Sequence, residues 1–238
     1  MRAISSTLLI LGLCIAAPSL RASVSFTSGN GSTCGSGLCF SSGTFNVTAT
    51  AYSTSVLNTP TSALTNTNVV LGQYSFGLGV CDNAENTASG GCQSPQHAID
   101  DNGGYVDFVL LTFSQPVTSI TLTLNPFQTV NDSMDVSYIT GTGAAPTVNG
   151  KTLAQLGTTV NVTGLNSGNP YQDQSFTVNP ASSVSWILVG ADVNQTDNYF
   201  KLQSMSYSTT PEPATFVLAG SALLGLGLLR RKKRSVSV

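Results

Sequence analysis

The chain has 238 residues, of which 41% are hydrophobic and only 8% are charged. Five of its nine basic side chains lie within residues 230–234, whereas residues 24–210 hold ten acidic and two basic side chains, a formal charge of −8. This charge repels phosphate backbones and excludes nucleic acid as a partner. The length suits one ordinary domain with accessory segments, and the aliphatic content is high enough for a buried core.

Residues 1–22 have the parts of a secretory signal peptide. Arg2 gives a basic start, an apolar run extends from Leu8 to Ala17, and the segment ends on the small residue Ala22. The apolar run is about ten residues long, which is too short for a helix that spans a membrane. We therefore expect removal of this segment on export, with the mature chain beginning near Ser23.

Residues 23–209 have the pattern of one β-rich domain. Short runs enriched in β-branched and aromatic residues alternate with turn sequences built from Gly, Asn and Pro. This pattern predicts an all-β fold, an antiparallel β-sandwich of the jelly-roll type. The predicted strands are 44–52, 69–76, 105–113, 117–124, 134–140, 158–162, 174–178, 184–189 and 199–207.

Two of these strands carry more specific predictions. Residues 117–124 alternate in polarity, which places Thr118, Ile120, Leu122 and Leu124 on the face toward the core. Residues 106–111 contain few polar positions, as expected for a central strand that is covered on both faces.

Four cysteines remain once the signal peptide is removed, namely Cys34, Cys39, Cys81 and Cys92. An even number of cysteines in an exported chain predicts disulfide bonds. Local closure favours the pairs Cys34–Cys39 and Cys81–Cys92, because each pair brackets a short loop rich in Gly, Ser and Asn. A zinc site is disfavoured, since neither spacing is Cys-x-x-Cys and the chain has a single histidine.

Acidic residues gather between positions 82 and 107, interspersed with asparagines. Carboxylate and amide oxygens in loops are ligands for calcium, so calcium is the candidate cofactor. The expected ligands are Asp100, Asp101 and Asn102, with Asp132 and Asp135 as a second, weaker candidate. The alternative is that these side chains cap backbone groups in turns.

The remaining polar and aromatic residues give little support for catalysis. His97 is the only histidine and no Gly-x-Ser-x-Gly sequence is present, so we expect no enzyme activity. A glycosidase remains an alternative, because that chemistry needs only two carboxyl groups, one as acid and one as nucleophile or base. Tyr171, in a polar loop, is the candidate sugar contact, while Trp186 is expected in the core.

The C-terminal segment, residues 210–238, has three parts in order. Pro211, Glu212 and Pro213 precede the uncharged stretch 214–229, and basic residues fill 230–234. As a helix the stretch measures about 24 Å, short of the hydrocarbon thickness, although flanking arginines can extend its span. The basic cluster should stay cytoplasmic, which leaves residues 23–209 facing outward.

This C-terminal segment resembles the PEP-CTERM sorting signal of Gram-negative bacteria. The resemblance implies recognition by an exosortase, a membrane protease, with an inner-membrane-anchored precursor that is processed and sent to the cell surface or extracellular matrix. Phrases inside residues 99–113, 131–135, 186–191 and 197–202 are also similar to exosortase-dependent surface domains of jelly-roll type. We therefore expect a non-catalytic surface or matrix protein associated with exopolysaccharide or biofilm; the alternatives are a carbohydrate-binding module and a secreted hydrolase.

Overall fold

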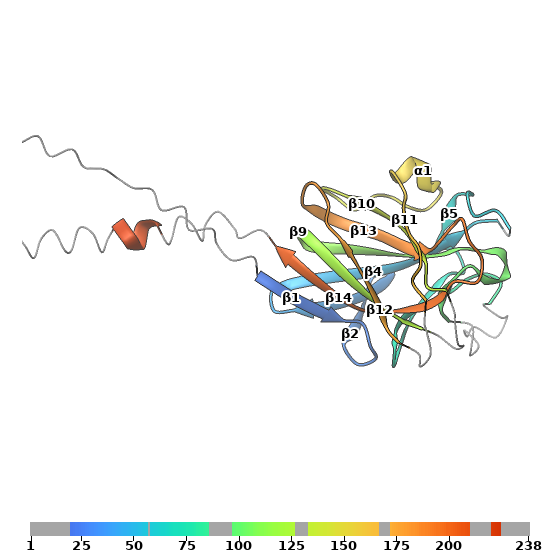
Figure 1. Cartoon of the computed structure of the whole chain (residues 1–238), viewed down its shortest axis with the longest axis horizontal. Helices are drawn as coiled ribbons and strands as arrows, with labels where there is room; N and C mark the ends of the chain where they lie inside the picture. Colours follow the sequence, from blue (N-terminus) through green and yellow to red (C-terminus); the bar gives the residue numbers. More distant parts are fainter. Residues whose placement is uncertain are drawn as a thin grey trace, which may run out of the picture. The chain divides into compact units, whose positions relative to one another are not determined.

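The structure, a computed structural model, describes residues 20–56, 58–85, 97–126, 133–166, 172–209 and 220–224. The chain divides into two units: Arg21–Thr210 is one, and Met1–Leu20 with Pro211–Val238 is the other. In the described residues of the first unit nearly all regular structure is β-strand (Figure 1).

Fourteen strands in the described residues belong to one sheet, which is built from antiparallel strand pairs. This confirms the prediction of an all-β fold with an antiparallel sheet. The elements in chain order are β1 (Leu20–Ser25), β2 (Gly31–Cys34), β3 (Gly37–Ser42), β4 (Phe45–Thr54), β5 (Leu64–Thr65), β6 (Val70–Tyr74), β7 (Gly77–Cys81), β8 (Ile99–Asp100), β9 (Asp107–Pro126), β10 (Val136–Gly141), α1 (Leu153–Leu156), β11 (Val160–Val162), β12 (Gln174–Val178), β13 (Val184–Ala191) and β14 (Tyr199–Thr209).

Strand β9 organises the sheet because its two halves have different neighbours. Its first half pairs with β4 on one side and β13 on the other. Its second half pairs with β12 and β14. Figure 1 shows β9 passing between these strands, which lie far apart in the sequence. Two groups of strands therefore share one long strand.

Two hydrophobic clusters pack against β9. The larger cluster takes side chains from both strand groups, including Val109 and Leu111 of the first half and Ile120 and Leu122 of the second. The smaller cluster lies on the other face of the first half and includes Phe108 and Leu110 together with Trp186. The predicted covering of both faces at residues 106–111 is confirmed, since all six residues are buried.

One expectation for β9 is wrong. The alternating pattern placed Thr118 toward the core, but Val117 is fully buried and Thr118 is only partly buried. The cause is a register shift: Ser119 pairs with Ser208 while Val117 pairs with Thr209, so β9 has one extra residue here. The bulge turns Thr118 aside, and its hydroxyl donates to the Ser208 carbonyl oxygen at 3.2 Å.

The hairpin of β2 and β3 carries a disulfide between Cys34 and Cys39, with the two Cα atoms 5.7 Å apart. This confirms the first predicted pair. Cys81, at the end of β7, is also disulfide-bonded, and its predicted partner Cys92 lies outside the described residues.

The second unit is described only at Leu20 and over residues 220–224. Residues 220–224 are helical and lie inside the stretch 214–229 in which the sequence predicts a helix. No helix in the part of the chain that the structure describes is both long and apolar enough to cross a membrane. Residues 1–19 of the predicted signal peptide lie outside the described residues, and β1 begins at Leu20, three residues before the predicted start at Ser23.

Candidate functional site

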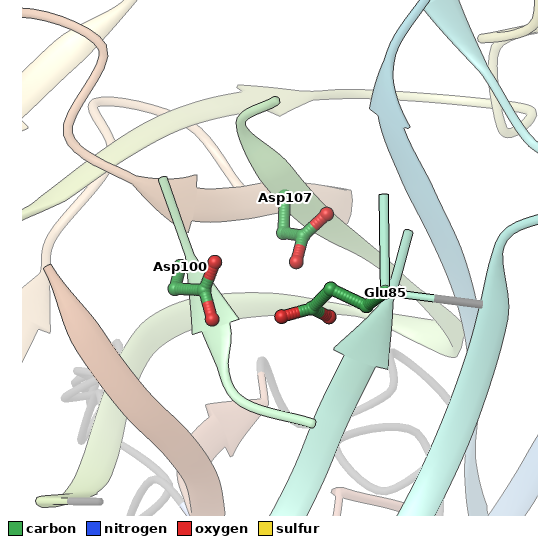
Figure 2. Close-up of side chains that lie close together, drawn as sticks. All are labelled: Glu85, Asp100 and Asp107. Carbon is green, nitrogen blue, oxygen red and sulfur yellow. The ribbon is translucent and has the colours of Figure 1, made fainter. Parts of the chain in front are cut away.

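Three acidic side chains converge inside the first unit. One carboxylate oxygen from each of Glu85, Asp100 and Asp107 lies within 4.8 Å of the others. Figure 2 shows the three carboxylates facing a common space. All three residues are buried, with exposed fractions of 6%, 3% and 0%. Such convergence of buried carboxylates is costly unless a proton or a cation compensates their charge.

Each carboxylate comes from a different element. Asp100 ends β8, whose pairing with Tyr199 of β14 fixes its position. Asp107 begins β9 and pairs with Ser53 of β4. Glu85 lies in the turn after β7, where the carboxylate of Asp82 accepts hydrogen bonds from the N–H groups of Ala84 at 2.7 Å and Glu85 at 3.1 Å. The Asp82 cap therefore orders the turn that presents Glu85.

Several oxygens of this cluster have no hydrogen-bond partner. Both carboxylate oxygens of Glu85, both of Asp107 and the hydroxyl of Ser53 are buried without a partner among the described residues. The Ser53 hydroxyl lies near enough to Asp107 to favour its ionised form, although it makes no hydrogen bond. Buried polar atoms are nearly always paired, so five unpaired oxygens in one place point to a missing partner.

The electrostatics follow from burial and like charge. Burial, then the charge of Asp82, raises the pKa of Glu85 to about 7, although the backbone N–H of Asp82 and, to a smaller extent, the positive charge of Lys201 oppose the shift. Burial raises the pKa of Asp107 well above its ordinary value, and the charges of Asp100, Asp82 and Glu85 raise it further. In the absence of a cation, burial and like charge therefore favour the protonated forms of Glu85 and Asp107.

The structure separates the residues that the sequence put forward as a calcium site. Asp100 lies in the cluster, but the Asp101 carboxylate accepts hydrogen bonds from the backbone N–H of Asn198 at 3.0 Å and from its side-chain Nδ2 at 2.9 Å. Asn102 starts the 3₁₀ turn Asn102–Gly104. Asp135, of the second candidate, accepts from the N–H of Leu165 at 2.8 Å, whereas Asp132 lies outside the described residues.

Sequence reasoning included Glu85 and Asp107 in its acidic region but not in its ligand set. Asp107 opens an otherwise apolar strand, and Glu85 is fifteen residues before Asp100, so no spacing in the sequence linked them. One signal could have identified Asp107: it is a charged residue at the start of a strand that the sequence predicts to be covered on both faces, and a buried charge needs a partner. Tyr171, Pro211, Glu212 and Pro213 lie outside the described residues.

A shallow pocket of about 450 Å³ lies beside the β6–β7 hairpin. It is lined by Gln73, Tyr74, Phe76, His97 and Lys201, together with two serines. The rings of Tyr74 and His97 stack with their centroids 4.0 Å apart, and Phe76 is 58% exposed. Aromatic and amide groups on an open surface are suited to binding a polar ligand with apolar faces.

The fold and the site define an antiparallel β protein with a buried acidic centre. A family model of the PEP-CTERM protein-sorting motif matches residues 209–233. The chain therefore carries a PEP-CTERM sorting motif, as the resemblance of its C-terminal segment indicated. Searches of curated proteins and of solved structures gave no match.

Proposed function

We propose that the chain is exported, held in the inner membrane as a precursor and then processed by an exosortase for delivery to the cell surface or extracellular matrix of a Gram-negative bacterium. There it serves as a non-catalytic component associated with exopolysaccharide or biofilm. The observation that carries this proposal is the sorting motif at residues 209–233. The disulfide between Cys34 and Cys39 supports an oxidising, extracytoplasmic location.

For the exported domain we infer a β-sandwich of the jelly-roll type. Supporting this inference, β9 joins two strand groups, β4 and β13 at one end and β12 and β14 at the other. The larger hydrophobic cluster takes residues from both groups, as it would between two layers.

The proposed processing is tested by intact mass. In a host that contains an exosortase, the full chain should yield a surface form that begins near Ser23 and ends between Pro211 and Pro213. Deletion of the exosortase gene should keep the full C-terminal segment attached and the protein in the membrane fraction.

Glu212→Gln changes the motif by one charge and should also block processing. Pro180→Ala, which alters a loop proline outside the motif, is the matched control and should be processed normally. Recovery of wild-type protein that still carries residues 230–234 in the surface fraction would contradict the proposal.

A carbohydrate-binding module is the second candidate. The exposed ring of Phe76, beside the stacked pair of Tyr74 and His97, favours it because aromatic faces stack on sugars. Binding of the full chain to purified exopolysaccharide, lost in Phe76→Ala and retained in Val56→Ala at another exposed apolar position, would establish this activity. Equal binding by both variants would show that the pocket beside Phe76 is not the sugar-binding site.

We assign no hydrolase activity. The three carboxylates that come together are each less than a tenth exposed, so a polysaccharide has no access to them. Glycosidases need both carboxyl groups at the sugar bond. Turnover of polysaccharide panels by the full chain is the test, and release of reducing sugar that Glu85→Gln abolishes would overturn this assignment.

A further inference from the structure

We propose that Glu85, Asp100 and Asp107, together with the Ser53 hydroxyl, form a buried binding site for one calcium ion. The three carboxylates approach one another to within 4.8 Å although they come from three separate elements. This arrangement differs from the consecutive residues 100–102 that the sequence suggested, because it needs the folded chain to assemble.

The unpaired oxygens provide independent support. Glu85, Asp107 and Ser53 are 6%, 0% and 1% exposed, and their side-chain oxygens lack partners among the described residues. In Figure 2 the Glu85 and Asp107 carboxylates point into the space that they share with Asp100. A cation in that space would bind oxygens of Glu85 and Asp107 together, which reduces the cost of leaving them unpaired.

The charge of the site also requires a cation or protons. Three carboxylates carry a formal charge of −3 when ionised, and the charge of Asp82 adds to the repulsion at Glu85 and Asp107. Lys201 is a buried base whose charge interacts favourably with Asp100 and Glu85, but it cannot balance all of them. A divalent ion brings the charge near to balance.

The donor chemistry selects calcium. Each of the three carboxylates brings at least one oxygen into the shared space, and calcium accepts carboxylate oxygens, singly or in pairs, at flexible geometry. Magnesium keeps several waters, for which a site with all its side chains buried has little room. Zinc and copper favour nitrogen and sulfur ligands, and the cluster in the described residues has neither.

A cavity adjoins the site at Ser53. This residue lines the cavity, whose volume is about 200 Å³, with Asn83 and Tyr105 on its wall. The cavity borders the turn that holds Glu85, because Asn83 belongs to that turn.

The experiment uses the full chain purified in detergent, stripped with a chelator and returned to neutral buffer. Calorimetric titration with calcium chloride should show one ion per chain, with a dissociation constant at or below about 1 mM. Calcium should also raise the midpoint of thermal unfolding by several degrees, because it binds the folded state alone. Magnesium chloride and sodium chloride at matched ionic strength should have much smaller effects.

Two isosteric variants test the ligands without removing bulk. Glu85→Gln and Asp107→Asn should each weaken calcium binding at least about tenfold. In chelator, each should be at least as stable as wild type, since the amide is neutral without the cost of protonating a buried carboxylate. This second readout shows that the variants fold.

Two further variants serve as controls. Asp173→Asn alters an exposed carboxylate that accepts from Asn125 and should leave calcium affinity unchanged. Asp101→Asn should also leave affinity unchanged, because that carboxylate binds Asn198 instead.

Three results would overturn the proposal. Calcium and sodium chloride acting alike would show general screening of negative charge. Glu85→Gln and Asp107→Asn titrating as wild type would place any bound ion elsewhere. No calcium binding, with wild type more stable in chelator than both variants, would show that shared protons hold the cluster together.

Discussion

Lys201 donates a hydrogen bond from Nζ to the backbone carbonyl oxygen of His97 at 2.9 Å, and the same Nζ lies 2.5 Å from His97 Nδ1. Nζ is also 4.5 Å from the centre of the Tyr74 ring, on which the His97 ring stacks. Burial lowers the pKa of Lys201 to about 7, although the charges of Asp100 and Glu85 raise it. Burial and the charge of Lys201 lower the pKa of His97.

The lowered pKa of Lys201 predicts a contribution to stability that increases with pH above neutrality. Between about pH 7 and about pH 10 the unfolded chain holds a proton on Lys201 that the folded chain releases, so the contribution of Lys201 to the free energy of unfolding rises with pH. Chemical unfolding of metal-free protein across this window should show the rise. His97, Tyr74, Asp100 and Glu85 are among the groups that act on Lys201.

Lys201→Met should flatten the pH dependence, because methionine keeps much of the volume and removes the titration. Lys151→Met, at an exposed lysine, should keep the wild-type slope. Equal slopes in wild type and Lys201→Met would show that Lys201 keeps an ordinary pKa in the folded chain.

The side chain of Asn198 links three segments that are separated in the sequence. Its removal should therefore cause a large loss of stability. It is fully buried; its Nδ2 donates to Asp101, and its Oδ1 accepts from the Ser133 hydroxyl at 2.9 Å and the Asp135 N–H at 3.1 Å. Asn198→Ala leaves these partners unpaired, so we expect a loss of about 2 to 4 kcal/mol in denaturant unfolding. Asn194→Ala, at an exposed position, should cost less than about 0.5 kcal/mol. Comparable losses in both variants would argue against the network.

The strand content was predictable because side-chain alternation is a local signal. Residues 106–111 and 117–124 were recognised as strand, and the structure joins them into β9. The change of partners along β9 was not predictable, since it depends on β4, β12, β13 and β14 arriving from distant positions. The bulge at Thr118 was missed for the same reason, because it is an offset between two strands rather than a property of one.

The candidate site was predictable only in composition. The sequence identified the acidic region 82–107 and Asp100 within it. It also predicted Asp101 as a ligand, but the structure places Asp107 in the cluster and pairs Asp101 with Asn198. Asp100 ends β8, whereas Asp101 lies beyond the strand and its carboxylate binds Asn198, so the two neighbours have different partners. Glu85 reaches the cluster through a turn capped by Asp82, a contact that no periodicity reveals.

The Cys34–Cys39 disulfide predicts a modest, measurable stabilisation. It closes a short loop within the β2–β3 hairpin, and restriction of the unfolded chain over this loop is worth about 2 kcal/mol. The double variant Cys34→Ser with Cys39→Ser isolates this bond, because reductant would also break the disulfide of Cys81. The midpoint of thermal unfolding should fall by several degrees. Peptide mapping without reductant should recover residues 34 and 39 crosslinked; free thiols at both would refute the bond.

The last prediction concerns Gly141, which ends β10 directly opposite Trp186 of β13. A methyl group on Gly141 would overlap the Trp186 indole, which is 6% exposed and belongs to the smaller hydrophobic cluster. Gly141→Ala must displace the ring, at a cost of about 1 to 3 kcal/mol. Because the chain has one tryptophan, its emission spectrum reports this site alone, and we expect a shift to longer wavelength.

Gly143→Ala is the matched control two residues away. Gly143 has φ of +75° with open space around it, so alanine there strains the backbone by about 1 kcal/mol and meets no side chain. The unfolding midpoint should fall slightly while the emission spectrum stays at its wild-type position. The two variants thus separate steric displacement from backbone strain. An unchanged spectrum in Gly141→Ala, or the same shift in both variants, would mean that the indole does not pack across Gly141.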